Sequence, residues 1–299
     1  MSIPAIPIGE GSVRQGHARW EPGPLEGLGA GAWLVLGGGG LKGLAHVGAW
    51  QALEEARVRF SGIVGTSIGA LIGACVAGGL GWAELVPLAV ALRKEDIVRI
   101  NRRAVWINGI RQESLFLGEP LRAYIERILP VKDWEELKLP LQINAVNLET
   151  GKTEWFGTGA RTDVPLVDAV YASSALPVFY PPARMNGGVF VDGGTEHSFP
   201  LHRAVELGAT GIVGVDVGAG ERTQPHRILA QGMLAIHQRI FAIMSWRKRS
   251  DLVSSWEGPP LVFVRPNLEG YQTFDFESIL YFLEEGYRSA RAALLEGAR

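Results

Sequence analysis

The 299-residue chain has little of several features that mark whole classes of protein. It contains one cysteine, Cys75, which excludes an internal disulfide framework and is consistent with a reducing compartment. Its formal net charge is −2, so no excess of positive charge favours nucleic acid as a partner. The first residues lack the apolar core of a signal peptide. We therefore expect a cytoplasmic protein that does not bind nucleic acid.

The chain also lacks a clear membrane span. The longest stretch without charge, residues 60–83, is long enough to raise the question of a transmembrane helix. It contains Ser61, Thr66, Ser67 and many glycines, and a turn motif explains it better than a span does. Peripheral membrane contact and oligomer formation both stay open at this stage.

Two compositional regions are visible along the chain. Residues 1–30 are rich in proline and glycine without a period of 2 or 3.6, which predicts a flexible tail. Residues 31–299 show no repeat and no linker, and they predict one catalytic domain with a helical extension from about residue 226. The continuous apolar run 32–36, a glycine loop, a helical pattern and a second apolar strand at 63–64 indicate a parallel α/β beginning.

The remaining pattern predicts a three-layer α/β/α fold around a mostly parallel sheet. Expected strands cover residues 141–146, 152–156, 188–191, 212–217 and 261–264. Expected helices cover residues 82–96, 121–129, 164–173, 201–207 and 226–247, and a final helix runs from about Phe276 with Asp275 as its N-cap. Residues 97–117 stay unassigned, as a solvated loop or a lid.

The helix expected at 226–247 is apolar around most of its circumference. This composition predicts a helix buried in the core or at an oligomer interface. The alternative is a lid or membrane-contact helix, because Trp246 and Arg247-Lys248-Arg249 suit a lipid interface.

A serine motif is the first candidate for chemistry. Gly65-Thr66-Ser67-Ile68-Gly69 reads G-x-S-x-G between an apolar strand and a small-residue helix. This context is typical of a nucleophile elbow, in which a strained turn exposes the serine. The motif predicts Ser67 as a nucleophile, with Gly65 and Gly69 making room for the turn.

A glycine loop precedes the serine. Gly38-Gly39-Gly40-Leu41-Lys42-Gly43 matches the G-x-G-x-x-G of dinucleotide sites, and a nucleotide- or phosphate-binding module is therefore the alternative from another class. The second strand, however, runs into Ser67 and lacks the acidic residue that holds a ribose. If the loop lies beside Ser67, its backbone N–H groups form an oxyanion hole.

A serine nucleophile needs a base. In a classical triad the histidine would come from His197, His202, His226 or His237, oriented by an aspartate among Asp163, Asp168, Asp192 and Asp216. That arrangement would make the protein an α/β-hydrolase-type esterase. Asp192 differs from the others because it ends an apolar strand and precedes Gly193-Gly194, which lets it point into a cleft or simply form a turn.

Taken together, these motifs resemble the patatin-like phospholipase family. The resemblance rests on the glycine loop with Gly43, on the serine motif and on Asp192-Gly193-Gly194, supported by the segment 172–177 and Pro181-Pro182. It covers roughly residues 32–217 and leaves out the tail and the last long helices. It implies a patatin-like fold and hydrolysis of lipid acyl esters, as a phospholipase A, lysophospholipase or carboxylesterase.

The resemblance also implies roles for single residues. Ser67 would be the nucleophile and Asp192 its base, in a dyad without metal or cofactor, and Gly38, Gly39 and Gly40 would form the oxyanion hole. Lys42 occupies the family's usual basic position and would contact a headgroup, or it is simply solvated. After Asp192-Gly193-Gly194 the family often has an asparagine-containing turn, where this chain has Thr195-Glu196-His197. An inactive lipid-binding relative is a further alternative.

Overall fold

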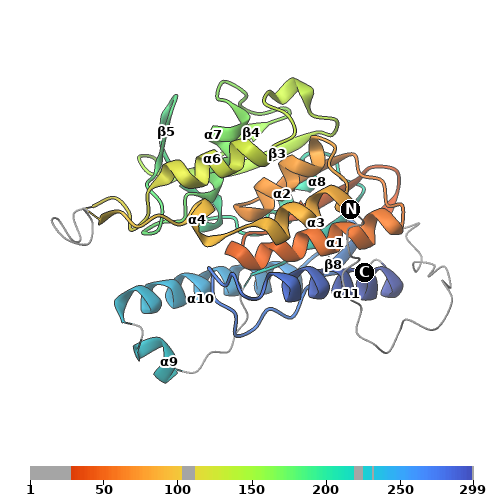
Figure 1. The fold of residues 1–299 in the computed structure, drawn as a ribbon. Coiled ribbons are helices and arrows are strands. Elements are labelled where there is room, and N and C mark those ends of the chain that lie inside the picture. The colour runs from red at the N-terminus through yellow and green to blue at the C-terminus, as the bar shows by residue number, and fades with distance from the viewer. Residues whose placement is uncertain (1–27, 103–111, 219–224, 231, 298–299) are drawn as a thin grey trace.

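The computed structural model describes residues 28–102, 112–218, 225–230 and 232–297 (Figure 1). Its strands form one eight-stranded sheet in the order β5-β6-β3-β2-β1-β7-β8, with β4 also paired to β3. The strands are β1 (Ala32–Leu36), β2 (Gly62–Gly65), β3 (Leu141–Asn147), β4 (Thr153–Gly157), β5 (Ala183–Met185), β6 (Gly188–Asp192), β7 (Gly211–Val215) and β8 (Leu261–Val264).

Strands β3, β2, β1, β7 and β8 pair in parallel across the centre of the sheet. At one side, β4 and β6 pair antiparallel with β3, and β5 pairs antiparallel with β6. In the central strand β1, Leu36 is paired with Gly65 of β2 and with Val215 of β7. The carboxyl ends of these three strands therefore meet at one edge, where open parallel sheets bind ligands. The glycine loop follows β1 there, and Ser67 follows β2.

Both faces of the sheet are covered. Alternate side chains of β1 enter two separate cores, with Leu34 and Leu36 in one and Trp33 and Val35 in the other. The first core packs against α1 (Ala45–Glu55), α2 (Ile68–Ala77), α3 (Trp82–Ala91), α6 (Gly118–Ile128), α7 (Leu166–Ser174) and α11 (Ile279–Glu296). The second packs against α8 (Leu201–Glu206). The predicted three-layer α/β/α fold with a mostly parallel sheet is confirmed.

Helices α1 and α11 lie side by side because glycines let their backbones touch. A Cβ atom on Gly48 of α1 would lie 1.8 Å from the carbonyl oxygen of Leu283, and one on Gly286 of α11 would lie 1.9 Å from that of Ala45. This packing fixes the start of α1, and hence the glycine loop that leads into it.

Several predicted helices have different bounds, for example the helix expected at 121–129, which is α6. The helix expected at 82–96 ends at Ala91, because Leu92 and Arg93 are extended before the short α4 (Lys94–Ile97). The last helix begins at Ile279, and its N-cap is Ser278 rather than Asp275. The helix expected at 226–247 is divided into α9 (Pro225–Ala230) and α10 (Met233–Ser254), with Gly232 at a positive φ of 79° before α10.

The prediction that residues 226–247 are buried in the core is wrong. Helix α10 runs along the border of the molecule in Figure 1, and Met233, Ile240 and Met244 are exposed. Its buried residues are the polar Ser245 and Arg249. Within the described residues, no helix combines the length and hydropathy needed to cross a bilayer.

Parts of other predictions fall outside the described chain. Residues 1–27 of the expected tail and 103–111 of the unassigned segment belong to the parts that the structure leaves undescribed. In the described remainder, Leu28 is buried, and its carbonyl accepts a hydrogen bond from Thr210. Phe116 packs with Phe179 and Phe274 in an aromatic cluster.

Candidate active site

Ser67 sits on the sharp turn between β2 and α2. Its φ of 57° and ψ of −125° are rare for a residue with a side chain, and they carry backbone strain. The glycines of the motif permit the turn, because a Cβ on Gly65 would lie 2.5 Å from the carbonyl oxygen of Gly69, and one on Gly69 would lie 2.2 Å from that of Leu36. The Oγ of Ser173 in α7 accepts the backbone N–H of Ser67 at 2.9 Å. The strained turn is therefore held from a distant helix.

Asp192 is distant from Ser67 in the sequence but contacts it in the fold. The Oγ of Ser67 donates to Oδ2 of Asp192 at 2.7 Å, and the N–H of Gly194 donates to Oδ1 at 2.7 Å. The carboxyl group is 3% exposed, and this burial raises its pKa to about 6, although the hydrogen bonds from Ser67 and Gly194 oppose the shift. The pKa of Asp192 is thus close to the value that suits a base near neutral pH.

The glycine loop lies beside the serine. A Cβ on Gly38 would be 3.3 Å from the Cβ of Ser67. The N–H of Gly38 donates to the carbonyl of Ser198 at 2.9 Å, whereas the N–H groups of Gly39 and Gly40 have no hydrogen-bond acceptor among the described residues. Of the three loop amides predicted for an oxyanion hole, those of Gly39 and Gly40 are therefore unoccupied.

The segment of His197 and Ser198 connects these parts through its backbone. The carbonyl of His197 accepts the hydroxyl of Thr66 at 3.0 Å and the amide of Asn144 at 3.0 Å. The carbonyl of Ser198 accepts Gly38. Sequence reasoning missed Asn144, Ser173 and Ser198 as supports of the site, since each is an ordinary polar residue in or beside an apolar element.

Among the described side chains, no histidine forms a hydrogen bond with Ser67. The His197 side chain is 51% exposed and approaches Glu196, and His202 stacks on Trp256. His237 lines the cavity from α10 and forms no hydrogen bond with Ser67. The side chain of His226 belongs to the undescribed part. Buried His46, which was not among the candidates, lies behind the glycine loop with Nε2 2.8 Å from the carbonyl oxygen of Gly37, and burial lowers its pKa to about 4.

A mostly apolar cavity of about 170 Å³ opens above Ser67 and Asp192. Its walls are the glycine loop, the inner face of α10 and apolar side chains that include Leu71, Leu176, Phe179, Tyr180 and Phe274. A buried aliphatic and aromatic lining of this kind suits an acyl chain.

Lys42 is, together with Arg249, a basic side chain that lines this cavity. It is 4% exposed, and its Nζ makes a long contact of 3.5 Å with the carbonyl of Tyr271. Burial, with the nearby Arg249, lowers the pKa of Lys42 to about 8, although Asp216 and Asp275 oppose this shift. The residue is therefore neither solvated nor on the surface, and it remains mostly protonated at neutral pH.

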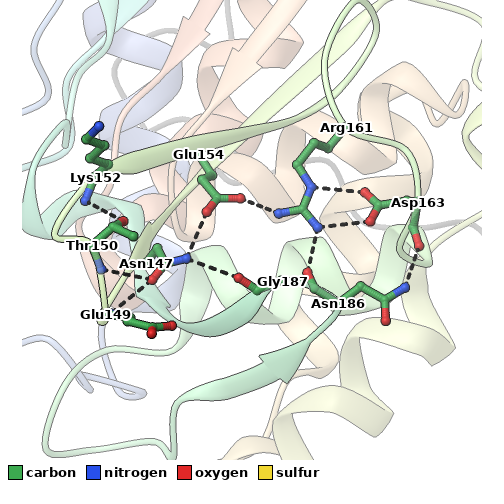
Figure 2. Close-up of polar contacts among 9 residues, drawn as sticks. All are labelled: Asn147, Glu149, Thr150, Lys152, Glu154, Arg161, Asp163, Asn186 and Gly187. Carbon is green, nitrogen blue, oxygen red and sulfur yellow. Dashed lines mark hydrogen bonds and ion pairs between the residues drawn. The ribbon is translucent and has the colours of Figure 1, made fainter.

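A polar network holds the antiparallel side of the sheet (Figure 2). Asn147 at the end of β3 accepts two N–H groups of the following turn and donates to Glu154 and to the carbonyl of Gly187. Arg161 joins Glu154 to Asp163 and to the carbonyl of Asn186. These contacts fix the turn before β6, the strand that ends at Asp192.

Among the described residues, no cluster of three or more histidine, cysteine or acidic side chains could hold a metal ion. The groups that line the cavity include the strained Ser67, the buried carboxylate of Asp192, the glycine loop and the basic side chains of Lys42 and Arg249.

This combination of a serine elbow, a glycine loop and a strand-end aspartate matches a known family. The family model described as patatin-like phospholipase matches residues 34–205, which is more than half of the chain. The chain belongs to the patatin-like phospholipase family, and the resemblance drawn from the motifs is confirmed.

Relatives carry the same similarity. An uncharacterised NTE family protein of Mycobacterium tuberculosis is 32% identical over 188 residues, covering 63% of this chain and 49% of the relative. Patatin-like phospholipase domain-containing protein 6 of Homo sapiens is 26% identical, covering 87% of this chain and 20% of its own length. Lysophospholipase NTE1 of Coccidioides immitis is 27% identical, with shares of 87% and 17%. The chain thus spans about half the mycobacterial relatives' length and a fifth or less of the others.

Solved structures show a more distant likeness. The structure of VipD from Legionella pneumophila aligns with a TM-score of 0.45 and 16% identity, covering 88% of this chain and 66% of that one. The structure of the type III effector protein ExoU aligns with a TM-score of 0.46 and 16% identity, covering 92% and 54%.

Proposed function

We propose that this protein hydrolyses acyl esters of lipids through a Ser67–Asp192 dyad. The observation that carries the proposal is the 2.7 Å hydrogen bond from Ser67 Oγ to a buried carboxylate whose pKa is raised to about 6. Membership of the patatin-like phospholipase family supports lipid esters as the substrate class. The names of two relatives, a lysophospholipase and a patatin-like phospholipase domain protein, point the same way.

The proposed reaction has two halves. Ser67 Oγ attacks the ester carbonyl carbon while its proton passes to Asp192, and the tetrahedral intermediate collapses to an acyl-serine as Asp192 gives that proton to the departing alcohol. Water then attacks the acyl-serine, Asp192 takes one of its protons, and the proton returns to Ser67 as the fatty acid leaves. A hydroxyl that already donates to the base needs little rearrangement to begin this sequence.

The negative oxygen of each intermediate needs donors. The amides of Gly39 and Gly40 are the candidates that the hydrogen bonding supports, while Gly38 keeps its bond to Ser198 and sets the position of the loop. One such donor contributes on the order of 3 kcal/mol to the transition state. The positive end of the α2 dipole beside Ser67 adds to this field.

The lining favours a substrate with one apolar and one anionic part. Leu71, Leu176 and Phe274 offer an apolar wall, and the buried Lys42 offers a positive charge whose Nζ lies 3.5 Å from the carbonyl oxygen of Tyr271. A phosphate ester near Lys42 with an acyl chain along the apolar wall would satisfy both. We therefore infer phospholipids or lysophospholipids in preference to neutral esters.

The experiment that tests the function is labelling with a fluorophosphonate probe, followed by assays on a panel of phospholipids and short-chain esters. We expect the wild type to be labelled at Ser67 and to release fatty acid, and Ser67→Ala to lose both. Absence of labelling in a folded wild type would favour an inactive lipid-binding relative. A nucleotide that raised the melting temperature would favour the nucleotide-binding alternative.

A further inference from the structure

Helix α10 exposes apolar side chains that a surface helix usually buries. In a surface helix the apolar stripe normally faces the core and the polar stripe faces solvent. In α10 the buried residues are Ser245 and Arg249, and the apolar stripe points outward. The helix is apolar around most of its circumference, and the protein leaves part of that apolar surface uncovered.

The outer face of α10 carries four apolar side chains at steps of three and four residues, which share one side of a helix, and the exposed His237 lies among them. Their exposed fractions are 83% for Met233, 37% for Ile236, 53% for Ile240 and 59% for Met244. Leu229 of the neighbouring α9 is 68% exposed. A contiguous exposed apolar patch of this kind marks an interaction site.

The opposite face of α10 forms a wall of the cavity. Gln238, Phe241, Ala242, Ser245 and Arg249 line the space above Ser67. Arg249 anchors this wall, because it forms a buried ion pair with Asp216 and donates to the hydroxyl of Ser198 at 3.2 Å. The same helix thus touches the candidate active site on one side and leaves its apolar stripe uncovered on the other.

Positive charge accompanies the apolar stripe. Arg247 continues the outer face three residues after Met244, and Lys248 flanks it; both are exposed. Of the four basic residues of α10, Arg249 is buried against Asp216, and the one acidic residue, Asp251, is exposed seven residues after Met244. An apolar face bordered by lysine and arginine is the composition of a helix that lies in the interface of an anionic bilayer.

We propose that the outer face of α10 docks on the surface of a bilayer that contains anionic phospholipid. Met233, Ile236, Ile240 and Met244 enter the boundary between headgroups and acyl chains, and Arg247 contacts the headgroups. This proposal rests on the proposed function in one respect, since a lipid substrate is what gives docking a purpose. With α10 on the bilayer, only the thickness of one helix separates the lipid from the cavity.

A second copy of the chain is the other occupant that an apolar face could accept. A stable protein interface buries roughly 800 Å² on each partner, from about 20 to 30 residues. The stripe on α10 and α9 offers five partly exposed side chains, well short of such an area. Their basic border also matches anionic headgroups better than an identical basic surface.

The test is co-sedimentation of Ser67→Ala protein with vesicles of phosphatidylcholine, with and without phosphatidylglycerol. On this inactive background, Ile240→Asp is compared with Leu148→Asp. Leu148 is 54% exposed, close to the 53% of Ile240, but lies at the turn after β3, so both variants add the same charge at equally exposed apolar sites. Met233→Asp repeats the test at the most exposed position of the stripe, and all variants are checked for an unchanged melting temperature.

We expect the Ser67→Ala protein to bind vesicles with phosphatidylglycerol, and Ile240→Asp and Met233→Asp to bind at least tenfold more weakly. Leu148→Asp should bind as the parent does. Arg247→Gln should weaken binding to the anionic vesicles about fivefold and leave binding to phosphatidylcholine unchanged.

Three results would overturn the proposal. These are no binding to either vesicle, equal binding by Ile240→Asp and Leu148→Asp, or a dimer that Ile240→Asp converts to monomer while vesicle binding persists. The proposed function is tested separately, by wild-type hydrolysis of a soluble short-chain ester. If vesicles bind but Ser67 is neither labelled nor active, the function fails and the docking surface stands.

Discussion

The backbone N–H of Ser67 donates to the hydroxyl oxygen of Ser173 at 2.9 Å, across 106 positions of sequence. Ser173 is fully buried in α7. Because Ser67 has a positive φ, its turn does not maintain itself and depends on such outside contacts. Ser173 is thus a positioning residue for the proposed nucleophile, since it contacts the backbone of Ser67.

Replacing Ser173 with alanine should leave the N–H of Ser67 without an acceptor. We expect a loss of about 1–2 kcal/mol in the free energy of unfolding and a fall in kcat, with KM little changed. Denaturant unfolding and ester hydrolysis measure the two effects. Ser174→Ala is the matched control, since the Oγ of Ser174 has no hydrogen-bond partner in the described part of the chain. Equal behaviour of the two variants would contradict the role of Ser173.

The pH dependence of hydrolysis should follow Asp192. A base accepts a proton only when ionised, and the pKa of Asp192 is raised to about 6 by burial. On a neutral ester, kcat/KM should therefore rise with pH, reach half of its plateau near pH 6 and stay flat just above. Asp192→Asn should be slower by a factor of about 10³ or more, without this inflection.

The histidine alternative is decided in the same assay. His197→Ala should retain nearly all activity, because the imidazole is about half exposed and approaches Glu196 rather than Ser67. If His197→Ala were more damaging than Asp192→Asn, a histidine base would replace the dyad.

Asp192 should also cost the protein stability at neutral pH. Its folded pKa of about 6 lies above the ordinary value of 3.8, so the folded state binds protons more tightly than the unfolded chain. The contribution of Asp192 to the free energy of unfolding is then greatest below pH 4. It is lost as the pH rises through 6, by at most about 3 kcal/mol. Asp192→Asn removes this loss, and its stability relative to wild type should grow between pH 4 and pH 7.

Unfolding in urea at several pH values measures this difference. Asp163→Asn provides a contrast of opposite sign, because hydrogen bonding to Arg161 lowers the pKa of Asp163. Its loss relative to wild type should be smallest in acid. If the difference in the free energy of unfolding between Asp192→Asn and wild type did not depend on pH, burial would not raise the pKa of Asp192.

Lys42 should set the preference for anionic lipids. In Lys42→Met we expect kcat/KM on phosphatidylglycerol to fall about tenfold or more, since charged hydrogen bonds carry 1.5–3 kcal/mol, with a smaller change on a neutral short-chain ester. The wild type should also lose activity on the anionic lipid above pH 8, where Lys42 loses its proton. Lys152→Met, an exposed lysine in the turn before β4, is the control. An equal fall on both substrates would assign Lys42 a structural role.

Several parts of the molecule followed from the sequence alone. The parallel core was predictable because β1, β2 and β7 are short continuous apolar runs, which are typical of strands buried on both faces. The motifs around Ser67 and Gly38–Gly40 were visible because a tight turn and a close backbone approach demand glycine at fixed spacing. Chain order together with these local demands identified the family.

Other parts depended on contacts between distant segments. The pairing of β6 with β3 brings Asp192 against Ser67, and buried polar residues such as Asn144, Ser173 and Ser198 hold them there. No local pattern marks such residues, since each is one polar side chain whose partner lies far away in sequence.

Helix α10 shows the difference most directly. Its apolar character around most of its circumference was evident from the sequence, and the period indicated a helix. Periodicity states which residues share a face and not what that face meets. The buried pair of Arg249 and Asp216 orients α10, so the side with Phe241 and Ser245 lines the cavity and the side with Met233, Ile240 and Met244 faces outward. The sequence determined the two sides of this helix, and tertiary contacts decided which side the protein buries.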